Sequence, residues 1–208
     1  MLLNLHLMLR CLLTCIFCFV FSVLSTAQQQ SFRLQSLSFS FMNENVAFPS
    51  IKLFENPVHP GVAIGAVFPF AGKEHSLFSL HPELSYYFHK QHENALLLNF
   101  PVKYHYRFNF GMAIGGGIGI GYLHTFSNQQ EYKFANGAYT QSNGIGKPQF
   151  AVTTGIDFSY KFFNEKKHPM DLFVAYTFMV QLPYAAPIGI PLLPHTIFQI
   201  GTSWYLFP

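Results

Sequence analysis

Charged residues are scarce in this sequence. Of 208 residues, 12 are Lys or Arg and 9 are Asp or Glu, so only 10% carry a formal charge. Soluble domains average about 25% charged residues, so a surface facing water is difficult to build from this composition. The formal net charge of +3 comes without a basic cluster, which argues against nucleic-acid binding. An 18% share of aromatic residues also excludes a disordered chain.

The N-terminal segment has the order of a secretory signal. Arg10 precedes an uncharged apolar run at 11–24, and the small residues at 25–27 follow it. This run of about 14 apolar residues is too short to cross roughly 30 Å of hydrocarbon, and positive charge, apolar core and small residues in this order are typical of a cleaved signal peptide. We therefore predict that residues 1–27 are removed after export.

Cysteine is absent from the predicted mature chain. The three cysteines, Cys11, Cys15 and Cys18, all lie in the signal segment. Residues 28–208 therefore form no disulfides and carry no thiolate chemistry. Their length suits one domain.

Long hydrophobic runs are also missing after the signal segment, so no transmembrane helix is expected. In their place, apolar and polar residues alternate with a period of two, which is the signature of a strand with two different faces. From 96 to 110 the even positions are all apolar or aromatic, whereas most odd positions are polar. Similar alternation predicts eight strands, at 32–42, 60–70, 76–89, 96–110, 112–124, 148–162, 171–182 and 196–207.

Several of these strands are longer than the usual 5–6 residues of soluble proteins and match the 9–11 residues that span a membrane. The connections mostly alternate between long and short, as in outer-membrane barrels. On 112–124 one face is Met, Ile and Tyr, and the other is Ala and Gly. Small residues suit a crowded barrel interior, and the apolar face suits lipid. The predicted fold is an all-β, antiparallel up-and-down transmembrane β-barrel with eight strands.

Three segments carry a resemblance to a known group of proteins: Gly-Met-Ala-Ile-Gly-Gly-Gly-Ile-Gly-Ile-Gly-Tyr-Leu-His at 111–124, Thr-Gly-Ile-Asp-Phe-Ser-Tyr at 154–160, and Gly-Thr-Ser-Trp-Tyr-Leu-Phe at 201–207. With them, residues 28–208 resemble the small eight-stranded outer-membrane barrel proteins of Gram-negative bacteria. The resemblance implies location in the outer membrane, contact with its lipids and delivery to the barrel-insertion machinery. That machinery reads a terminal Phe, and here Pro208 follows Phe207.

Charged and polar residues on the inward-facing positions are predicted to fill the lumen. They are His81, Glu83, Lys103, His105, Arg107, Asp157 and Lys161. Charges in a dry lumen need partners, and a turn centred near residue 93 would place Glu83 opposite Lys103 and His81 opposite His105. The sharper alternative is a narrow path for protons or ions. No metal site is predicted, because the histidines are scattered and lack cysteine or clustered carboxylates, and no cofactor is expected.

One segment is a candidate for catalysis. His124 and Ser127, followed by Glu131, lie where a predicted strand enters a long connection. A histidine beside a serine, with a carboxylate to orient it, is the arrangement of an acyl hydrolase. The segment is similar to the His-x-Ser-Asn element of lipid A deacylases, but has one extra residue between His124 and Ser127.

The leading hypothesis is a non-enzymatic outer-membrane barrel with a filled lumen and a structural or surface-interaction role. A surface partner would bind through the long connections at 43–59, 125–147 and 183–195. The alternatives are an outer-leaflet lipid A acyl hydrolase and a secreted, soluble, ligand-binding barrel.

Overall fold

The computed structural model describes residues 32–46, 58–88, 93–127, 131–135, 137–142, 146–163, 169–183 and 191–206. The predicted signal segment at 1–27 lies outside these residues. Within them, no helix is long and apolar enough to cross a membrane.

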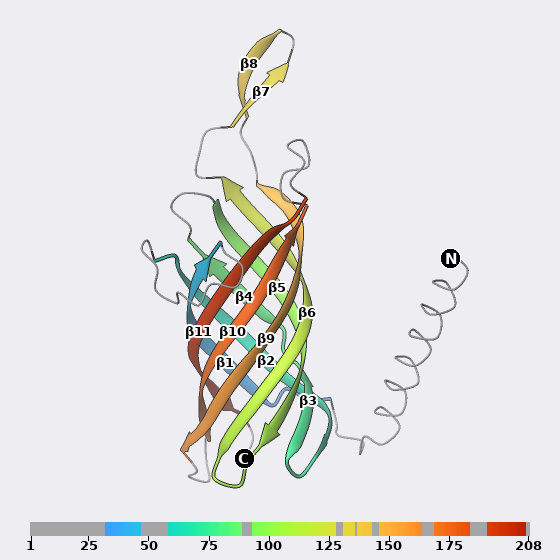
Figure 1. Ribbon diagram of the computed structural model, residues 1–208, viewed down its shortest axis with the longest axis vertical. Helices are drawn as coiled ribbons and strands as arrows, with labels where there is room; N and C mark the ends of the chain where they lie inside the picture. The colour runs from blue at the N-terminus through green and yellow to red at the C-terminus, as the bar shows by residue number, and fades with distance from the viewer. Residues whose placement is uncertain are drawn as a thin grey trace, which may run out of the picture.

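The described residues form a closed antiparallel barrel (Figure 1). Its strands are β1 (Ser36–Asn45), β2 (Pro60–Lys73), β3 (Ser76–Leu80), β4 (Glu83–Tyr87), β5 (Glu93–Arg107), β6 (Met112–Ser127), β9 (Lys147–Phe163), β10 (Met170–Leu182) and β11 (Leu193–Tyr205). The order around the sheet is β1-β11-β10-β9-β6-β5-β3-β2-β4, with additional pairings β1–β2 and β5–β4. Because β3 and β4 both lie between β2 and β5, they act as one interrupted strand, and the ring has the eight positions that the sequence predicts.

Three prolines meet where the third strand of the ring is interrupted. Proline cannot donate a ladder hydrogen bond, and Pro82 follows His81 in the gap between β3 and β4. The ladder is bridged there by single bonds from Ala66 N to Pro82 O and from His81 N to Pro101 O, both 2.9 Å. Beside them, the pairing of β2 with β3 shifts in register between Pro69 and Ala71. The interruption therefore follows from the prolines of three adjacent strands.

The two ends of the barrel differ. One end, called here the turn end, carries the short connections at 74–75, 108–111 and 164–169 and both ends of the described chain (Figure 1). In the 108–111 turn, Gly111 has a φ of 93°, a conformation that favours glycine. The opposite end, called the loop end, carries the connections 46–59, 88–92, 128–146 and 183–192.

The connection predicted at 125–147 contains two strands that the sequence analysis missed. β7 (Glu131–Ala135) and β8 (Ala138–Ser142) form a separate hairpin that projects beyond the loop end (Figure 1). Ala135 pairs with Ala138 across the two-residue turn Asn-Gly, in which Gly137 has a φ of 78°. Asn-Gly is a strong hairpin signal. The other two long connections are shorter than predicted, because 43–45 belong to β1 and 193–195 to β11.

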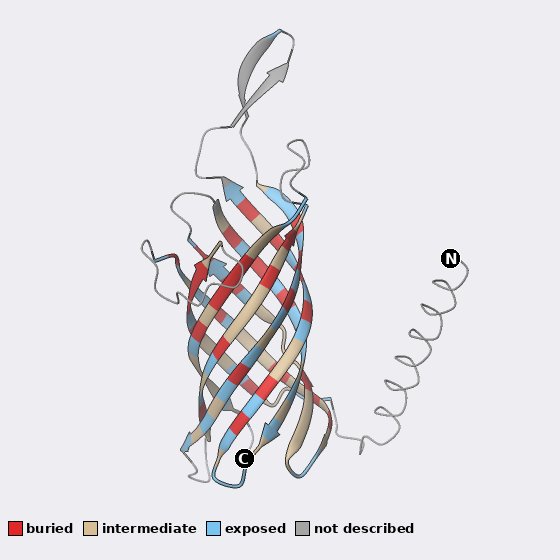
Figure 2. Ribbon diagram, viewed as in Figure 1, coloured by how far each residue is buried: buried red, intermediate tan, exposed pale blue. Residues whose placement is uncertain are grey.

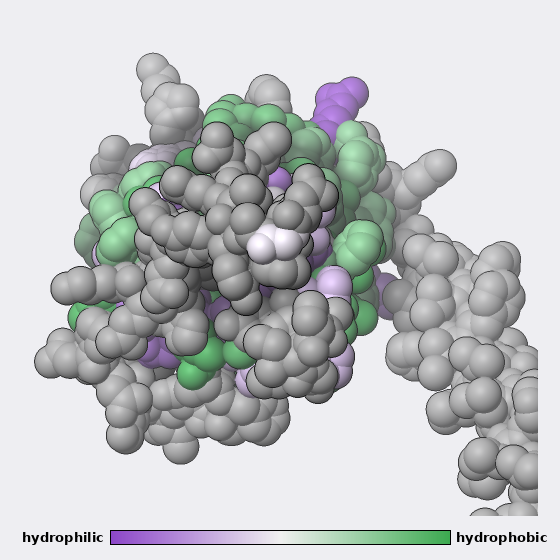
Figure 3. All heavy atoms as spheres, turned by 90° about the horizontal axis from the view of Figure 1, so that it is seen from above, coloured by the Kyte–Doolittle hydropathy of each residue, from purple (hydrophilic) through white to green (hydrophobic). Residues whose placement is uncertain are grey.

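Apolar side chains cover the outside of the barrel. Ile118, Ile120 and Phe150 are each 70% exposed, and exposed large apolar residues occur on β1, β2, β4, β5, β6, β9, β10 and β11. The alternate positions of the barrel strands are mostly buried or half-buried (Figure 2). Viewed from the loop end, apolar residues surround the perimeter (Figure 3). A soluble barrel would turn its polar face to water, whereas the outward face here is apolar.

Candidate functional site in the barrel lumen

The turn-end half of the lumen is a polar cavity of ≈ 360 Å³. Its walls include hydroxyl, amide, imidazole and charged side chains from strands all around the ring. All seven residues predicted to fill the lumen line this cavity: His81, Glu83, Lys103, His105, Arg107, Asp157 and Lys161.

Glycines on the inner face of β6 make room for the side chains of its two neighbours. A Cβ on Gly115 would lie 2.5 Å from His105 Nε2 and 2.7 Å from Asp157 Oδ1. A Cβ on Gly117 would lie 2.8 Å from Lys103 Cγ. Side chains of β5 and β9 therefore meet across β6, which lies between them, only because β6 has no side chains at these positions.

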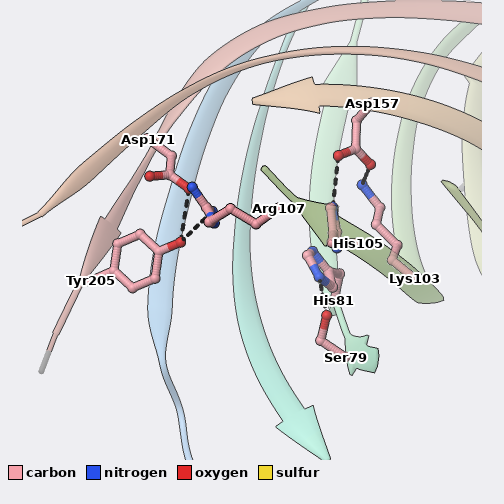
Figure 4. Close-up of polar contacts among 8 residues, drawn as sticks. All are labelled: Ser79, His81, Lys103, His105, Arg107, Asp157, Asp171 and Tyr205. Atoms are coloured by element: carbon pink, nitrogen blue, oxygen red, sulfur yellow. Dashed lines mark hydrogen bonds and ion pairs between the residues drawn. The ribbon is translucent and has the colours of Figure 1, made fainter. Parts of the chain in front are cut away.

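Asp157 is the centre of the first polar cluster (Figure 4). Its Oδ2 accepts a hydrogen bond from Lys103 Nζ at 3.1 Å, and its Oδ1 lies 2.7 Å from His105 Nε2. The Asp157 side chain is 6% exposed and that of Lys103 is 24% exposed. A buried carboxylate thus contacts one permanent cation and one imidazole, which offsets much of its desolvation cost.

His81 extends this cluster toward β3. Its ring stacks on that of His105, with centroids 5.3 Å apart, and its Nε2 is hydrogen-bonded to Ser79 Oγ at 2.8 Å. The two histidines are close although they are not cross-strand partners.

The predicted register of this hairpin was wrong. Glu83 pairs with Asn99, and Lys103 pairs with Ser79, so the turn is centred two residues earlier than expected. β3 and β4 keep this same register against β5 on either side of the interruption. Glu83 instead accepts a hydrogen bond from Gln199 Nε2 at 3.1 Å on β11.

A second cluster lies at the mouth of the cavity. Arg107 Nη2 donates to Asp171 Oδ2 at 2.5 Å and to Tyr205 Oη at 3.1 Å, and Tyr205 Oη donates to Asp171 Oδ2 at 2.8 Å (Figure 4). Lys161 Nζ lies 5.9 Å from the centroid of the Tyr205 ring. Sequence reasoning missed Asp171 and Tyr205, although their odd numbers place them on the same inward track as Phe173 and Ser203.

Above the cavity, toward the loop end, the lumen is closed by an apolar layer. Leu123 and Met179 are 0% exposed and Leu97 is 2% exposed. The layer, as we use the term, consists of Met42, Ala63, Tyr87, Ala95, Leu97, Leu123, Ala151, Met179 and Ile197. No residue of this layer was among the predicted site residues.

Beyond the apolar layer lies a buried chain of hydrogen bonds, called here the loop-end chain. It runs from Glu44 through His195, Gln181 and Gln149 to the carbonyl of Pro183. On four strands each member is two positions nearer the loop end than an apolar-layer residue, so the two sets stack: 44 on 42, 195 on 197, 181 on 179 and 149 on 151. His195 was predicted in a connection but belongs to β11.

Of the candidate catalytic residues His124, Ser127 and Glu131, the structure describes the side chain of His124 alone. His124 lies in β6, where its Nδ1 is 2.9 Å from Tyr122 Oη, and its ring is 4.8 Å from that of Phe126. Ser127 ends β6 and Glu131 begins β7, but their side chains lie outside the described part of the chain. Within the described residues, no group of three or more His, Cys, Asp or Glu residues could hold a metal ion.

Comparisons with known proteins agree with the barrel architecture at low similarity. No family model matches the sequence, and no curated protein matches it. Among solved structures, Neisserial surface protein A is 12% identical with a TM-score of 0.44, over 81% of this chain and 93% of that one. The N-terminal β-barrel domain of Pseudomonas aeruginosa OprF is 11% identical with a TM-score of 0.41, over 83% and 98%.

Ail of Yersinia pestis gives a similar result. It is 10% identical with a TM-score of 0.39, over 83% of this chain and 99% of that one. The class that the strand order itself defines is that of all-β, antiparallel, eight-stranded barrels.

Proposed function

We propose that the mature chain is an integral outer-membrane barrel that passes no solutes and has a structural or surface-interaction role. The observation that carries this proposal is the apolar belt around a closed ring. Exposed apolar patches of this extent are avoided by soluble monomers, whereas hydrocarbon favours them and forbids unpaired strand edges.

The side chains in the lumen support the proposal that the barrel passes no solutes. The apolar layer fills the interior with buried Leu, Met, Ile and Ala side chains, and an eight-stranded ring has only enough room for side chains. Hydrated ions would have to shed water to cross this layer, which is costly. The polar cavity is consequently a closed-ended space that opens at the turn end.

The orientation follows from the lengths of the connections. Outer-membrane barrels place short turns in the periplasm and long loops outside, so the turn end would face the periplasm. The contact surface for a partner would then be the loop end, with the connections 43–59, 125–147 and 183–195 and the projecting β7–β8 hairpin. Outer-membrane lipids would contact the belt, after insertion by the barrel-insertion machinery.

Fractionation and gel migration test the membrane location. The full chain should sediment with outer membranes, and unboiled samples should migrate differently from boiled samples, because a closed barrel resists SDS until heated. Recovery in a soluble fraction, or identical migration before and after boiling, would contradict the proposal. In planar bilayers, the purified barrel should give no steady conductance, whereas a porin run in parallel should.

Cysteine labelling tests the orientation, because the predicted mature chain has no cysteine of its own. Ala138→Cys in the β7–β8 hairpin should react with a membrane-impermeant maleimide on intact cells. Glu74→Cys in a turn-end connection should react only after the outer membrane is permeabilised. The reverse pattern would show the opposite orientation.

A further inference from the structure

The loop-end chain has a direction that is set at one end by a backbone carbonyl. Gln149 Nε2 donates to Pro183 O at 2.9 Å. A carbonyl oxygen can only accept, so the side-chain amide of Gln149 must turn its nitrogen toward Pro183. Its oxygen is then left to face Gln181 and Thr125.

This orientation fixes the next amide. Gln149 Oε1 lies 2.6 Å from Gln181 Nε2 and accepts from Thr125 Oγ1 at 3.3 Å. Since Gln181 must donate to that oxygen, its own oxygen faces the next member. That oxygen is 2.6 Å from His195 Nε2. His195 must therefore carry a proton on Nε2.

The far end of the chain then holds one shared proton. His195 Nδ1 is 2.7 Å from Glu44 Oε1, and Nε2 is already protonated. The proton between these two atoms belongs either to an imidazolium facing a carboxylate or to a carboxylic acid facing a neutral imidazole. The pair has zero net charge in both forms, which suits side chains that are 3% and 0% exposed.

The groups around the pair preserve this arrangement. His59 Nδ1 donates to the Glu44 carbonyl oxygen at 2.9 Å and lies 4.0 Å from Glu44 Oε2. The Tyr87 ring lies 6.4 Å from the His195 ring. His59 directly precedes β2, which pairs with β1 on the side away from β11, and Tyr87 belongs to β4.

We propose that Glu44, His195, Gln181 and Gln149 form a directional hydrogen-bond lock that ties the start of the 183–192 connection to the barrel wall. The lock joins β1, β11, β10 and β9 over the apolar layer, and Thr125 of β6 donates to its member Gln149. Each member donates a hydrogen bond to the next, from His195 to Gln181, from Gln181 to Gln149, and from Gln149 to the Pro183 carbonyl.

Two near-isosteric substitutions distinguish a directional lock from simple space filling. In Glu44→Gln, the new amide can donate to His195 Nδ1, so the direction of the chain is kept. In Gln149→Glu, a carboxylate oxygen faces the Pro183 carbonyl and the chain loses a donor. Both variants preserve side-chain shape, so packing alone predicts little effect from either.

Hydrogen exchange of β11 amides in the detergent-solubilised full barrel measures the effect. Glu44→Gln should change exchange by less than about twofold, whereas Gln149→Glu should accelerate it by roughly tenfold or more, since a buried group loses its partner. Equal effects of the two variants would overturn the lock.

A second measurement decides the matter if Gln149→Glu does not fold. Nitrogen-15 NMR of histidine in the unaltered barrel should show His195 protonated at Nε2. A neutral His195 protonated only at Nδ1 would overturn the proposal, because the chain could not then run in the direction that Pro183 requires.

Discussion

The two halves of the lumen use the same strands but treat polar groups differently. The turn-end half has a cavity and charged clusters, in which Lys103 and Arg107 contact Asp157 and Asp171. In the loop-end half, the described polar groups Glu44, Gln149, Gln181 and His195 are almost fully buried and are joined in one chain of hydrogen bonds. The apolar layer separates them.

The difference shows how solvent access decides which polar groups an interior can hold. Long basic side chains in the cavity remain partly exposed, at 24% for Lys103 and 34% for Arg107, so they keep part of their hydration. Amides and a proton-sharing pair replace them where exposure falls to nearly zero, because an unpaired charge there would be far more costly.

Removal of the central carboxylate should have the largest effect on the turn-end half. Asp157→Asn leaves Lys103 and His105 without the charge that both contact, and breaking such a buried pair costs about 3–5 kcal/mol. We expect the lower end of that range, because Lys103 is partly exposed. Urea unfolding of the refolded barrel measures it.

The double variant Asp157→Asn with Lys103→Met is the matched control. It removes the unpaired cation together with the carboxylate, so part of the lost stability should return. If the single variant unfolds like the unaltered barrel, the cluster contributes nothing to stability and the contrast between the halves is lost.

A truncation in the apolar layer should have the next largest effect. Leu123 is 0% exposed. Leu123→Ala should therefore lower the free energy of unfolding by about 2–5 kcal/mol, through lost burial and a remaining cavity. Leu98→Ala on the outer face of β5, where the residue is 38% exposed, should cost less in the same unfolding assay. Equal losses would indicate that the layer is not tightly packed.

The sequence predicted the barrel but only part of the interior. Alternation with a period of two reports which face a residue occupies, so the ring and the inward track of Lys103, His105 and Asp157 followed from it. The alternation does not fix the register, and Glu83 pairs with Asn99 instead of Lys103. Contacts between strands that are not neighbours, such as Lys103 with Asp157, depend on the small residues of the strand between them and were beyond local pattern.

The loop-end chain was missed for a different reason. Gln149, Gln181 and His195 are ordinary polar residues near predicted strand ends, where exposure to water is the usual expectation. Only their position beyond a buried apolar layer makes them interior. The Asn-Gly at 136–137, in contrast, is a local hairpin signal in the sequence itself.

The β6 glycines allow a sharper test of the turn-end half, with a smaller effect. In Gly115→Ala the new Cβ would lie 2.5 Å from His105 Nε2, so the cluster must shift, at a cost of about 1–3 kcal/mol. The control is Gly116→Ala on the outer face, where the closest atom would be 3.4 Å away. Equal stability of the two variants would show that the glycines do not make room for the cluster.

The smallest expected effect concerns the mouth of the cavity. Tyr205→Phe removes the hydroxyl that donates to Asp171 Oδ2 at 2.8 Å and accepts from Arg107 at 3.1 Å. A single hydrogen bond contributes about 1 kcal/mol net, and Arg107 keeps its own bond to Asp171, so the free energy of unfolding should fall by about 1 kcal/mol. Tyr160→Phe, on the exposed outer face of β9, should lower it by less in the same assay. A loss as large as that of Asp157→Asn would mean that the two clusters act as one network, and that the turn-end half is coupled throughout instead of built from separate pairs.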